Sequence, residues 1–187
     1  NLKAYRGVSD FNVPQRFVLN YVWQLPSPKQ GVAKALLGGW ETSAILSLQS
    51  GFPLNITSGG DYSYSLPEVS NDQAQTISAP QYTSGTRNDR ITQWFTTNAF
   101  TTPQSNTFGN SGRNILIGPG TVNIDFSVHK DFLFSEHFRL QYRAEFFNLV
   151  NHTQLNNPDT TVIDSTFGQI TKARDPRITQ MALKLIF

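Results

Sequence analysis

Charged side chains alternate along the string FRLQYRAEFF, where Arg139, Arg143 and Glu145 occupy odd positions. Residues two apart share one face of a β-strand, so these three would lie together. Asp125 and Asp131 share one phase of a second alternating string, VNIDFSVHKDF, and can pair with them across a hairpin. We therefore expect Asp125, Arg139, Arg143 and Glu145 to face a water-filled lumen. Two roles stay open for this surface, an ion-pair ladder and a wall that holds a plug or guides a solute.

Residue patterns typical of enzymes are missing from the sequence. The three histidines, His129, His137 and His152, are too far apart for a motif such as HExxH. No serine lies in a GxSxG string, and no nucleophile, base and third group occur at an interpretable spacing. Cysteine is absent, which excludes thiolate metal sites and disulfides. The sequence therefore predicts no enzyme, with no catalytic residues, no metal site and no cofactor.

Five strings of about ten residues alternate apolar and polar side chains, and they would form the elements that position the charged residues. A strand of this length, tilted near 45°, covers roughly 25 Å, the height of the apolar band of a transmembrane barrel. One face of these strands is uncharged apart from strand ends, whereas the other carries charges in mid-strand. One face thus suits lipid and the other suits water. We expect strands at 16–25, 40–49, 122–132, 138–147 and 177–187.

Composition and connection lengths favour the same fold. Charged residues make up 15% of the chain and aromatic residues 12%, and no window of about 18 apolar residues predicts a helical span. The net charge of +2 forms no basic stripe, so we expect no nucleic-acid partner. The sequence predicts an all-β, antiparallel, up-and-down portion of a transmembrane β-barrel with about five long strands. One very long outer loop, 51–120, would be extracellular, and a helical turn is expected around 32–37.

The long loop contains aromatic side chains that can stack on a sugar or a peptide. The last outer connection, 148–176, contains the string FGQIT, for which we expect a strand extension above the membrane. The candidate ligand contacts in the long loop are Tyr62, Tyr64, Tyr82, Trp94 and Phe95.

Several longer strings carry a family resemblance. These are VPQRFVLNYVWQLP, GGWETSAILSLQSGFPLNI, FGNSGRNILIGPG and LQYRAEFFNLVNHTQLNNP, followed by FGQI and the terminal strand. In this order they resemble the C-terminal barrel of TonB-dependent receptor-like proteins of the Oar type, which carry a carboxypeptidase-regulatory-like domain, and the resemblance covers nearly the whole chain. It implies a place in the bacterial outer membrane and energy-driven uptake of a large nutrient through a plugged barrel, with the transported ligand unknown.

The chain terminus resembles the signal that the barrel-assembly machinery recognises. Gln180, Ala182, Leu185 and Phe187 fit its spacing, with Ala182 in place of the usual glycine. The resemblance therefore adds this machinery to the expected partners.

Relatives of the Oar type are several times longer, with a plug, a TonB box and a 22-stranded barrel. Since five strands cannot close a cylinder, we expect residues 1–187 to be the C-terminal part of such a barrel. Its partners would be outer-membrane lipid, the remaining strands and the plug. The alternative is a structural or adhesive protein, secreted or assembled at the cell surface, whose apolar faces stack sheet on sheet.

Overall fold

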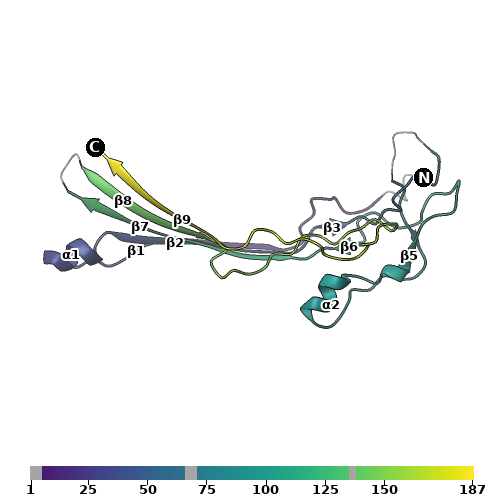
Figure 1. The fold of residues 1–187 in the computed structure, drawn as a ribbon, viewed down its shortest axis with the longest axis horizontal. Coiled ribbons are helices and arrows are strands. Elements are labelled where there is room, and N and C mark those ends of the chain that lie inside the picture. Colours follow the sequence, from purple (N-terminus) through teal and green to yellow (C-terminus); the bar gives the residue numbers. More distant parts are fainter. Residues whose placement is uncertain (1–5, 66–70, 135–137) are drawn as a thin grey trace. The chain divides into compact units, whose positions relative to one another are not determined.

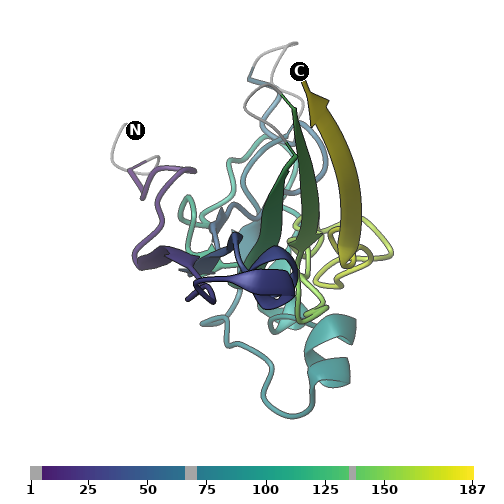
Figure 2. The ribbon, with the colours of Figure 1, turned by 90° about the vertical axis from the view of Figure 1, so that its left-hand side faces the viewer.

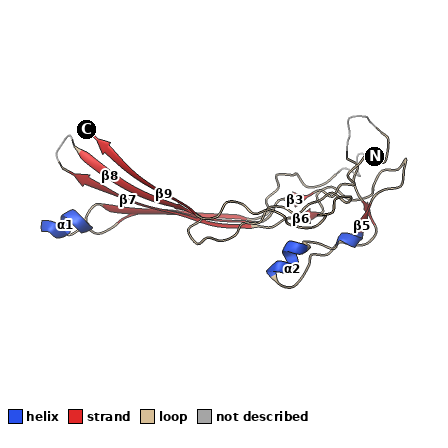
Figure 3. Cartoon of the chain, viewed as in Figure 1, coloured by secondary structure: helices blue, strands red, loops and turns tan. Residues whose placement is uncertain are grey.

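The computed structural model describes residues 6–65, 71–134 and 138–187 and divides the chain into two compact units. The sheet unit comprises Arg16–Gln49, Thr121–Gln154 and Asp175–Phe187. The loop unit comprises Asn1–Gln15, Ser50–Gly120 and Leu155–Arg174. Long strands dominate the sheet unit and loops dominate the loop unit (Figure 3).

The sheet unit is one antiparallel sheet with the strand order β1-β2-β7-β8-β9. Each strand pairs with the next long strand along the chain, which is an up-and-down topology. The strands fan apart toward the end of the sheet that carries the C-terminus (Figure 1). All five expected strands are observed, within one or two residues at each end. Their bounds are β1 Arg16–Gln24, β2 Trp40–Gln49, β7 Thr121–Leu133, β8 Arg139–Phe147 and β9 Ile178–Ile186.

The pairing register makes one face of the sheet apolar. A single row across it joins Tyr21, Ala44, Phe126, Phe146 and Thr179. Every side chain of β1 is exposed, and the described residues place no second layer of strands on this face. A sheet of a water-soluble protein would have this apolar face covered by other elements, because apolar area exposed to water costs about 25 cal/mol per Å².

The connection between β1 and β2, residues 25–39, lies within the sheet unit. It contains the helix α1, Gly31–Leu37, in agreement with the helical turn expected at 32–37. The helix lies at the same end of the sheet as the C-terminus, and β7, β8 and β9 run behind it side by side (Figure 2). None of the helices in the described ranges is long and apolar enough to cross a membrane.

The loop unit contains short elements joined by long irregular segments. Two small two-stranded sheets pair β3, Pro53–Leu54, with β6, Leu116–Ile117, and β4, Gln75–Thr76, with β5, Phe100–Thr101. The helix α2 spans Arg87–Thr92, and a 3-10 helix, η1, spans Thr97–Ala99. The connection 51–120 is therefore a folded structure that shares its unit with 155–174.

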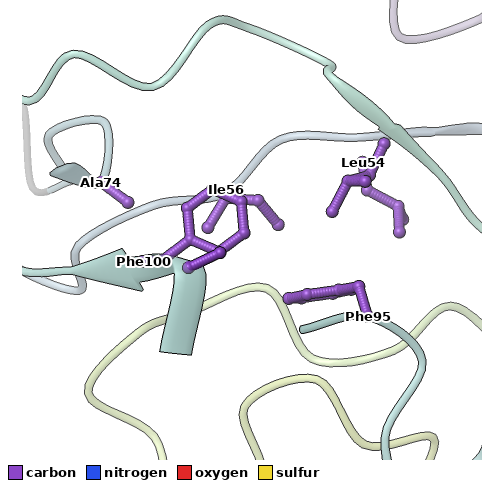
Figure 4. Packing of buried hydrophobic residues seen from close by; sticks show 7 residues of the cluster. Leu54, Ile56, Ala74, Phe95 and Phe100 are labelled. Atoms are coloured by element: carbon purple, nitrogen blue, oxygen red, sulfur yellow. The ribbon is translucent and has the colours of Figure 1, made fainter. Parts of the chain in front are cut away.

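Three phenylalanine rings organise the core of the loop unit. Phe95 lies 5.9 Å from Phe100 and 5.4 Å from Phe167 between ring centroids, and all three pairs meet edge to face. Such pairs add about 0.5–1.5 kcal/mol beyond the area that they bury. Figure 4 shows the side chains of Leu54, Ile56, Phe95 and Phe100, which come from different segments and point into one shared interior. The buried cluster comprises Leu54, Ile56, Ala74, Phe95, Ala99, Phe100 and Leu116.

The strand extension expected in the string FGQIT is not observed. Phe167 makes a single parallel bridge to Asp159, and the backbone around it turns at Gly168, whose φ is +78°. Its apolar residues pack into the loop unit instead, with Phe167 beside Phe95 and Ile170 only 6% exposed.

Candidate functional site

The polar face of the sheet carries a row of hydrogen-bonding side chains. Glu41 of β2 contacts the strands on both sides. Its carboxylate accepts a hydrogen bond from Gln24 Nε2 of β1 at 3.2 Å and lies 3.6 Å from His129 Nε2 of β7. Further along the same face, the hydroxyls of Ser43 and Ser127 are 2.7 Å apart. The register predicts this contact, because Ser43 and Ser127 are direct cross-strand partners.

Asp131 joins β7 to β8 on this face. Its Oδ2 lies 3.5 Å from Arg139 Nη1, and its Oδ1 accepts a hydrogen bond from Gln141 Nε2 at 3.0 Å. Arg143 pairs along its own strand with Glu145, at 3.6 Å between Nη1 and Oε1. The side chains of Arg139 and Arg143 keep 43% and 49% of their surface exposed. Exposed pairs of this kind contribute about 0–1 kcal/mol, so these charges can change partners at small cost.

Asp125 shares the polar face, but its hydrogen bonds join it to asparagines instead of the arginines that the sequence suggested. Its Oδ1 accepts from the backbone N–H of Asn148 at 3.0 Å and from Asn123 Nδ2 at 2.9 Å. Asp125 therefore holds the end of β8 in place. The structure places Asp125, Arg139, Arg143 and Glu145 on one face, and that this face lines a lumen stays a prediction.

Asn148 builds a compact turn after β8, in the string FFNLVNH. It is 6% exposed and has a φ of 53°. Its side chain donates to the carbonyl of His152 and accepts from the His152 N–H, both at 2.9 Å. Arg177 closes the turn, since its N–H donates to Asn151 Oδ1 at 3.0 Å. Sequence reasoning missed this role, although asparagine is the residue that most readily adopts a positive φ after glycine.

An aromatic recess lies in the loop unit. The rings of Tyr82 and Trp94 meet edge to face with 6.4 Å between centroids, and both bind the backbone of Ile117. The N–H of Ile117 donates to Tyr82 Oη at 2.7 Å, and Trp94 Nε1 donates to the Ile117 carbonyl at 2.9 Å. The recess encloses about 400 Å³, and its lining comprises Tyr82, Thr83, Arg90, Trp94, Ile117 and Gly118.

Arg90 gives the recess a cation, and α2 positions it. The helix begins with a capping box in which Asp89 N–H donates to Thr86 Oγ1 at 3.2 Å and Asp89 Oδ2 accepts from the Thr86 N–H at 2.8 Å. Hydrogen bonds from the Thr86 side chain and backbone lower the pKa of Asp89 below its ordinary value. The recess therefore combines two aromatic rings with one positive charge, which suits a sugar or a peptide that carries an acidic group.

The five aromatic residues expected to contact ligand lie in three different settings. Tyr82 and Trp94 line the recess. Phe95 is fully buried in the core, so its selection as a ligand contact is wrong for this conformation. Tyr62 and Tyr64 lie outside the lining of the recess, with Tyr64 68% exposed and at a φ of 50°.

The residues of the expected assembly signal lie on β9 and just beyond it. Gln180 and Ala182 oppose Glu145 and Arg143 on the polar face, and Leu185 opposes Leu140 on the apolar face. Phe187 follows the strand and is 95% exposed. The outer edge of β9 pairs with no strand in the part of the chain that the structure describes.

Histidines and acidic residues form no metal site within 6–65, 71–134 and 138–187, where no three of them gather. His129 contacts Glu41, and the backbone of His152 belongs to the Asn148 turn. His137 falls outside the described residues.

Comparison with known proteins agrees with the two-faced sheet. No curated protein and no solved structure matches the chain. The family described as outer membrane beta barrel domain matches residues 1–180, which is nearly the whole chain. An up-and-down antiparallel sheet with one apolar and one polar face is what this architecture requires. The chain therefore belongs to the outer membrane beta barrel domain family and resides in the bacterial outer membrane.

Proposed function

We propose that the chain forms part of an outer-membrane receptor of the TonB-dependent, Oar-like type, which imports a large nutrient without catalysing a reaction on it. The observation that carries the proposal is the pairing of two features in one chain. The sheet has a polar face whose ion pairs are weak and exchangeable, and the connections between its strands fold into a unit with an aromatic recess. A passive structural barrel also has a polar inner face, but it does not need an aromatic recess in the connections between its strands.

The polar face would act as the wall of the passage. It carries charges of both signs, with Glu41 and Asp131 on two neighbouring strands and Arg139 and Arg143 on the next. A solute or a plug that offers hydrogen-bonding groups can replace one partner of a half-exposed pair, at a cost within the roughly 0–1 kcal/mol of such pairs. The wall therefore suits transient contacts with a moving polar solute.

The sheet would be one part of a larger barrel. The outer edges of β1 and β9 each carry backbone groups with no strand partner among the described residues, and lipid supplies no hydrogen bonds to such groups. We propose that further strands pair with both edges, that a plug fills the lumen, and that the barrel-assembly machinery recognises β9 through Gln180, Ala182, Leu185 and Phe187.

The recess of the loop unit would make the first contact with the nutrient. Tyr82 and Trp94 are fixed by their hydrogen bonds to Ile117, so the apolar face of a sugar ring or a planar peptide group stacks on them without a cost for ordering the aromatic rings. Arg90 lines the same recess and would pair with an acidic group of the ligand.

Uptake by whole cells tests the proposal. Cells that express the protein as it is encoded are given a set of fluorescent oligosaccharides and oligopeptides too large for passive pores, with and without a protonophore. We expect uptake of at least one probe, its loss with the protonophore, and its reduction by Trp94→Ala but not by Tyr64→Phe. Uptake that persists with the protonophore would indicate a passive channel. No uptake of any probe beyond that of cells lacking the protein would favour the structural or adhesive alternative.

A further inference from the structure

One lysine stands on the apolar face of the sheet, against the pattern expected from the sequence. The row across the strands joins Trp40, Lys130, Tyr142 and Leu183, and Lys130 is the only charged residue on this face within the described strands. It is 2% exposed. An unpaired ammonium group beside hydrocarbon costs several kcal/mol, so its surroundings must compensate the charge.

The helix α1 supplies that compensation. Lys130 Nζ donates hydrogen bonds to the carbonyls of Ala35 at 2.7 Å and Leu36 at 2.5 Å. These carbonyls belong to the last turn of the helix, where backbone oxygens have no partner within the helix and carry partial negative charge. The ammonium also lies 5.1 Å from the Trp40 ring centroid and 4.7 Å from that of Phe132, within range of cation–π attraction.

Trp40 ties the same turn of α1 to the sheet. Its Nε1 donates to the Leu36 carbonyl at 3.1 Å, and its ring meets Tyr142 edge to face at 6.4 Å. Lys130 and Trp40 therefore hold one turn of the helix over the apolar face by three hydrogen bonds. The contact fixes α1 at a defined level along the strands.

The helix turns apolar side chains outward at this level. Val32, Leu36 and Leu37 are 75%, 62% and 61% exposed, and none of the seven residues of the helix is buried. The charged residues on the helix and just before it in the sequence are basic, Lys34 and Lys29, and its first turn contains no acidic residue. Apolar side chains beside lysines match the boundary between acyl chains and anionic headgroups.

A cavity beside the helix has the same mixed character. It encloses about 470 Å³ and is lined by Ser27, Lys34 and Asp131 together with Ala35, Phe132 and Leu133. A lining that mixes polar and apolar groups suits an amphiphile. Because α1 continues the face that the outer-membrane barrel family turns to lipid, phospholipid is the occupant that fits both the helix and the cavity.

We propose that α1 is an interfacial anchor: it lies in the headgroup region of the membrane with Val32, Leu36 and Leu37 in the acyl chains, and Lys130 holds it there. The anchor fixes the height of the sheet in the bilayer at the end that carries the C-terminus. Interfacial aromatic residues have the same effect, and Trp23 and Trp40 lie near this end. The proposal does not depend on transport.

A single-cysteine experiment tests the anchor, since the chain has no cysteine of its own. Leu36→Cys is labelled with an environment-sensitive fluorophore in the full protein, reconstituted in vesicles of phosphatidylethanolamine and phosphatidylglycerol. The matched control is Ile77→Cys, at a 66% exposed apolar residue of the loop unit. We expect the label at position 36 to be quenched by headgroup-attached nitroxides and protected from aqueous iodide, with the reverse for the label at position 77.

The role of Lys130 is tested in the same assay. Lys130→Met, which keeps the length and loses the charge, should reduce nitroxide quenching of the label on Leu36→Cys, and Lys130→Arg should retain it. Equal iodide quenching of the labels at positions 36 and 77 would overturn the proposal, because the helix would then lie in water. Protection of the label at position 36 from both quenchers would also overturn it, because protein would then cover the helix. If Lys130→Met fails to fold, the quenching of the label on Leu36→Cys in the protein with native Lys130 still tests the anchor.

Discussion

Tyr82 and Trp94 meet edge to face at 6.4 Å between ring centroids, and both rings are fixed by the backbone of one residue, Ile117. Tyr82 accepts from its N–H and Trp94 donates to its carbonyl. The protein's own backbone therefore positions the two rings of the recess, and their orientation depends on β6.

Removal of the Tyr82 hydroxyl tests this positioning. Tyr82→Phe leaves the Ile117 N–H without its acceptor, which should cost about 1 kcal/mol in the stability of the loop unit. The emission of Trp94 should shift as its ring gains freedom. Fluorescence of a Trp23→Phe, Trp40→Phe background reports Trp94 alone. Tyr64→Phe, at an exposed tyrosine, serves as control, and an equal shift there would contradict the role of Tyr82.

Phe95 should matter for folding of the loop unit and not for ligand contact. Phe95→Ala removes the ring that touches both Phe100 and Phe167, at an expected cost of about 3–5 kcal/mol. Limited proteolysis should then cut the segments 50–120 and 155–174 while the strands of the sheet stay protected. Phe108→Ala, at a residue that is 60% exposed, should leave the cleavage pattern unchanged. If segments 50–120 and 155–174 of Phe95→Ala resisted the protease, the phenylalanine core would be dispensable for folding of the loop unit.

Acid should loosen the contact between the N-terminal segment and the rest of the loop unit. Asp10 accepts from Asn114 Nδ2 at 2.6 Å and pairs with Arg113 at 2.7 Å, and these two contacts lower the pKa of Asp10 below its ordinary value of 3.8. A carboxyl whose pKa is lower in the folded state stabilises that state above its unfolded pKa. This stabilisation is lost as the pH falls through the folded value.

Hydrogen exchange measures the effect. Protection around Asn114 should be constant above about pH 5 and should fall below the ordinary pKa of about 4 for aspartate. Asp10→Asn should show, at all pH values, the weaker protection that the wild type shows only at low pH. The asparagine side chain has no charge and cannot form the ion pair with Arg113. A pH profile for Asp10→Asn identical to that of the wild type would assign the acid sensitivity to another group.

The two faces of β9 should differ in their contact with water. Met181 lies on the apolar face and Ala182 on the polar face, and both side chains are exposed in the sheet unit. Ala182→Cys should react with a membrane-impermeant maleimide in intact outer membranes, whereas Met181→Cys should stay unlabelled until detergent is added. Labelling of Met181→Cys before detergent would contradict the lipid-facing assignment.

Much of the sheet could be predicted from the sequence, because alternation with a period of two is a local signal and the strands are long. The pairing register can also be predicted from the alternation. A slip of one residue would move Phe126 to the polar face and Asp125 to the apolar face. Within the strands, Lys130 is the exception to the rule that the apolar face carries no charge. Its phase placed it on the apolar face, but its compensation by α1 depends on residues 95 positions away.

The loop unit was largely beyond prediction because its packing depends on contacts between distant segments. Tyr82, Trp94 and Phe95 are close in sequence and look alike as aromatic residues, yet Phe95 is buried and Tyr82 is 51% exposed. Phe95 packs against Phe167, which comes from the connection between β8 and β9. No short-range pattern in the sequence links those two segments.

The shared phenylalanine core has a consequence for how this region changes over generations. Since Phe95 and Phe100 come from one interstrand connection and Phe167 from another, an insertion or replacement in either connection alters the packing of both. Recombination that exchanged one connection alone would leave a mismatched interior. The two connections should therefore be inherited as a block and co-vary, while the strands between them diverge at their own rate.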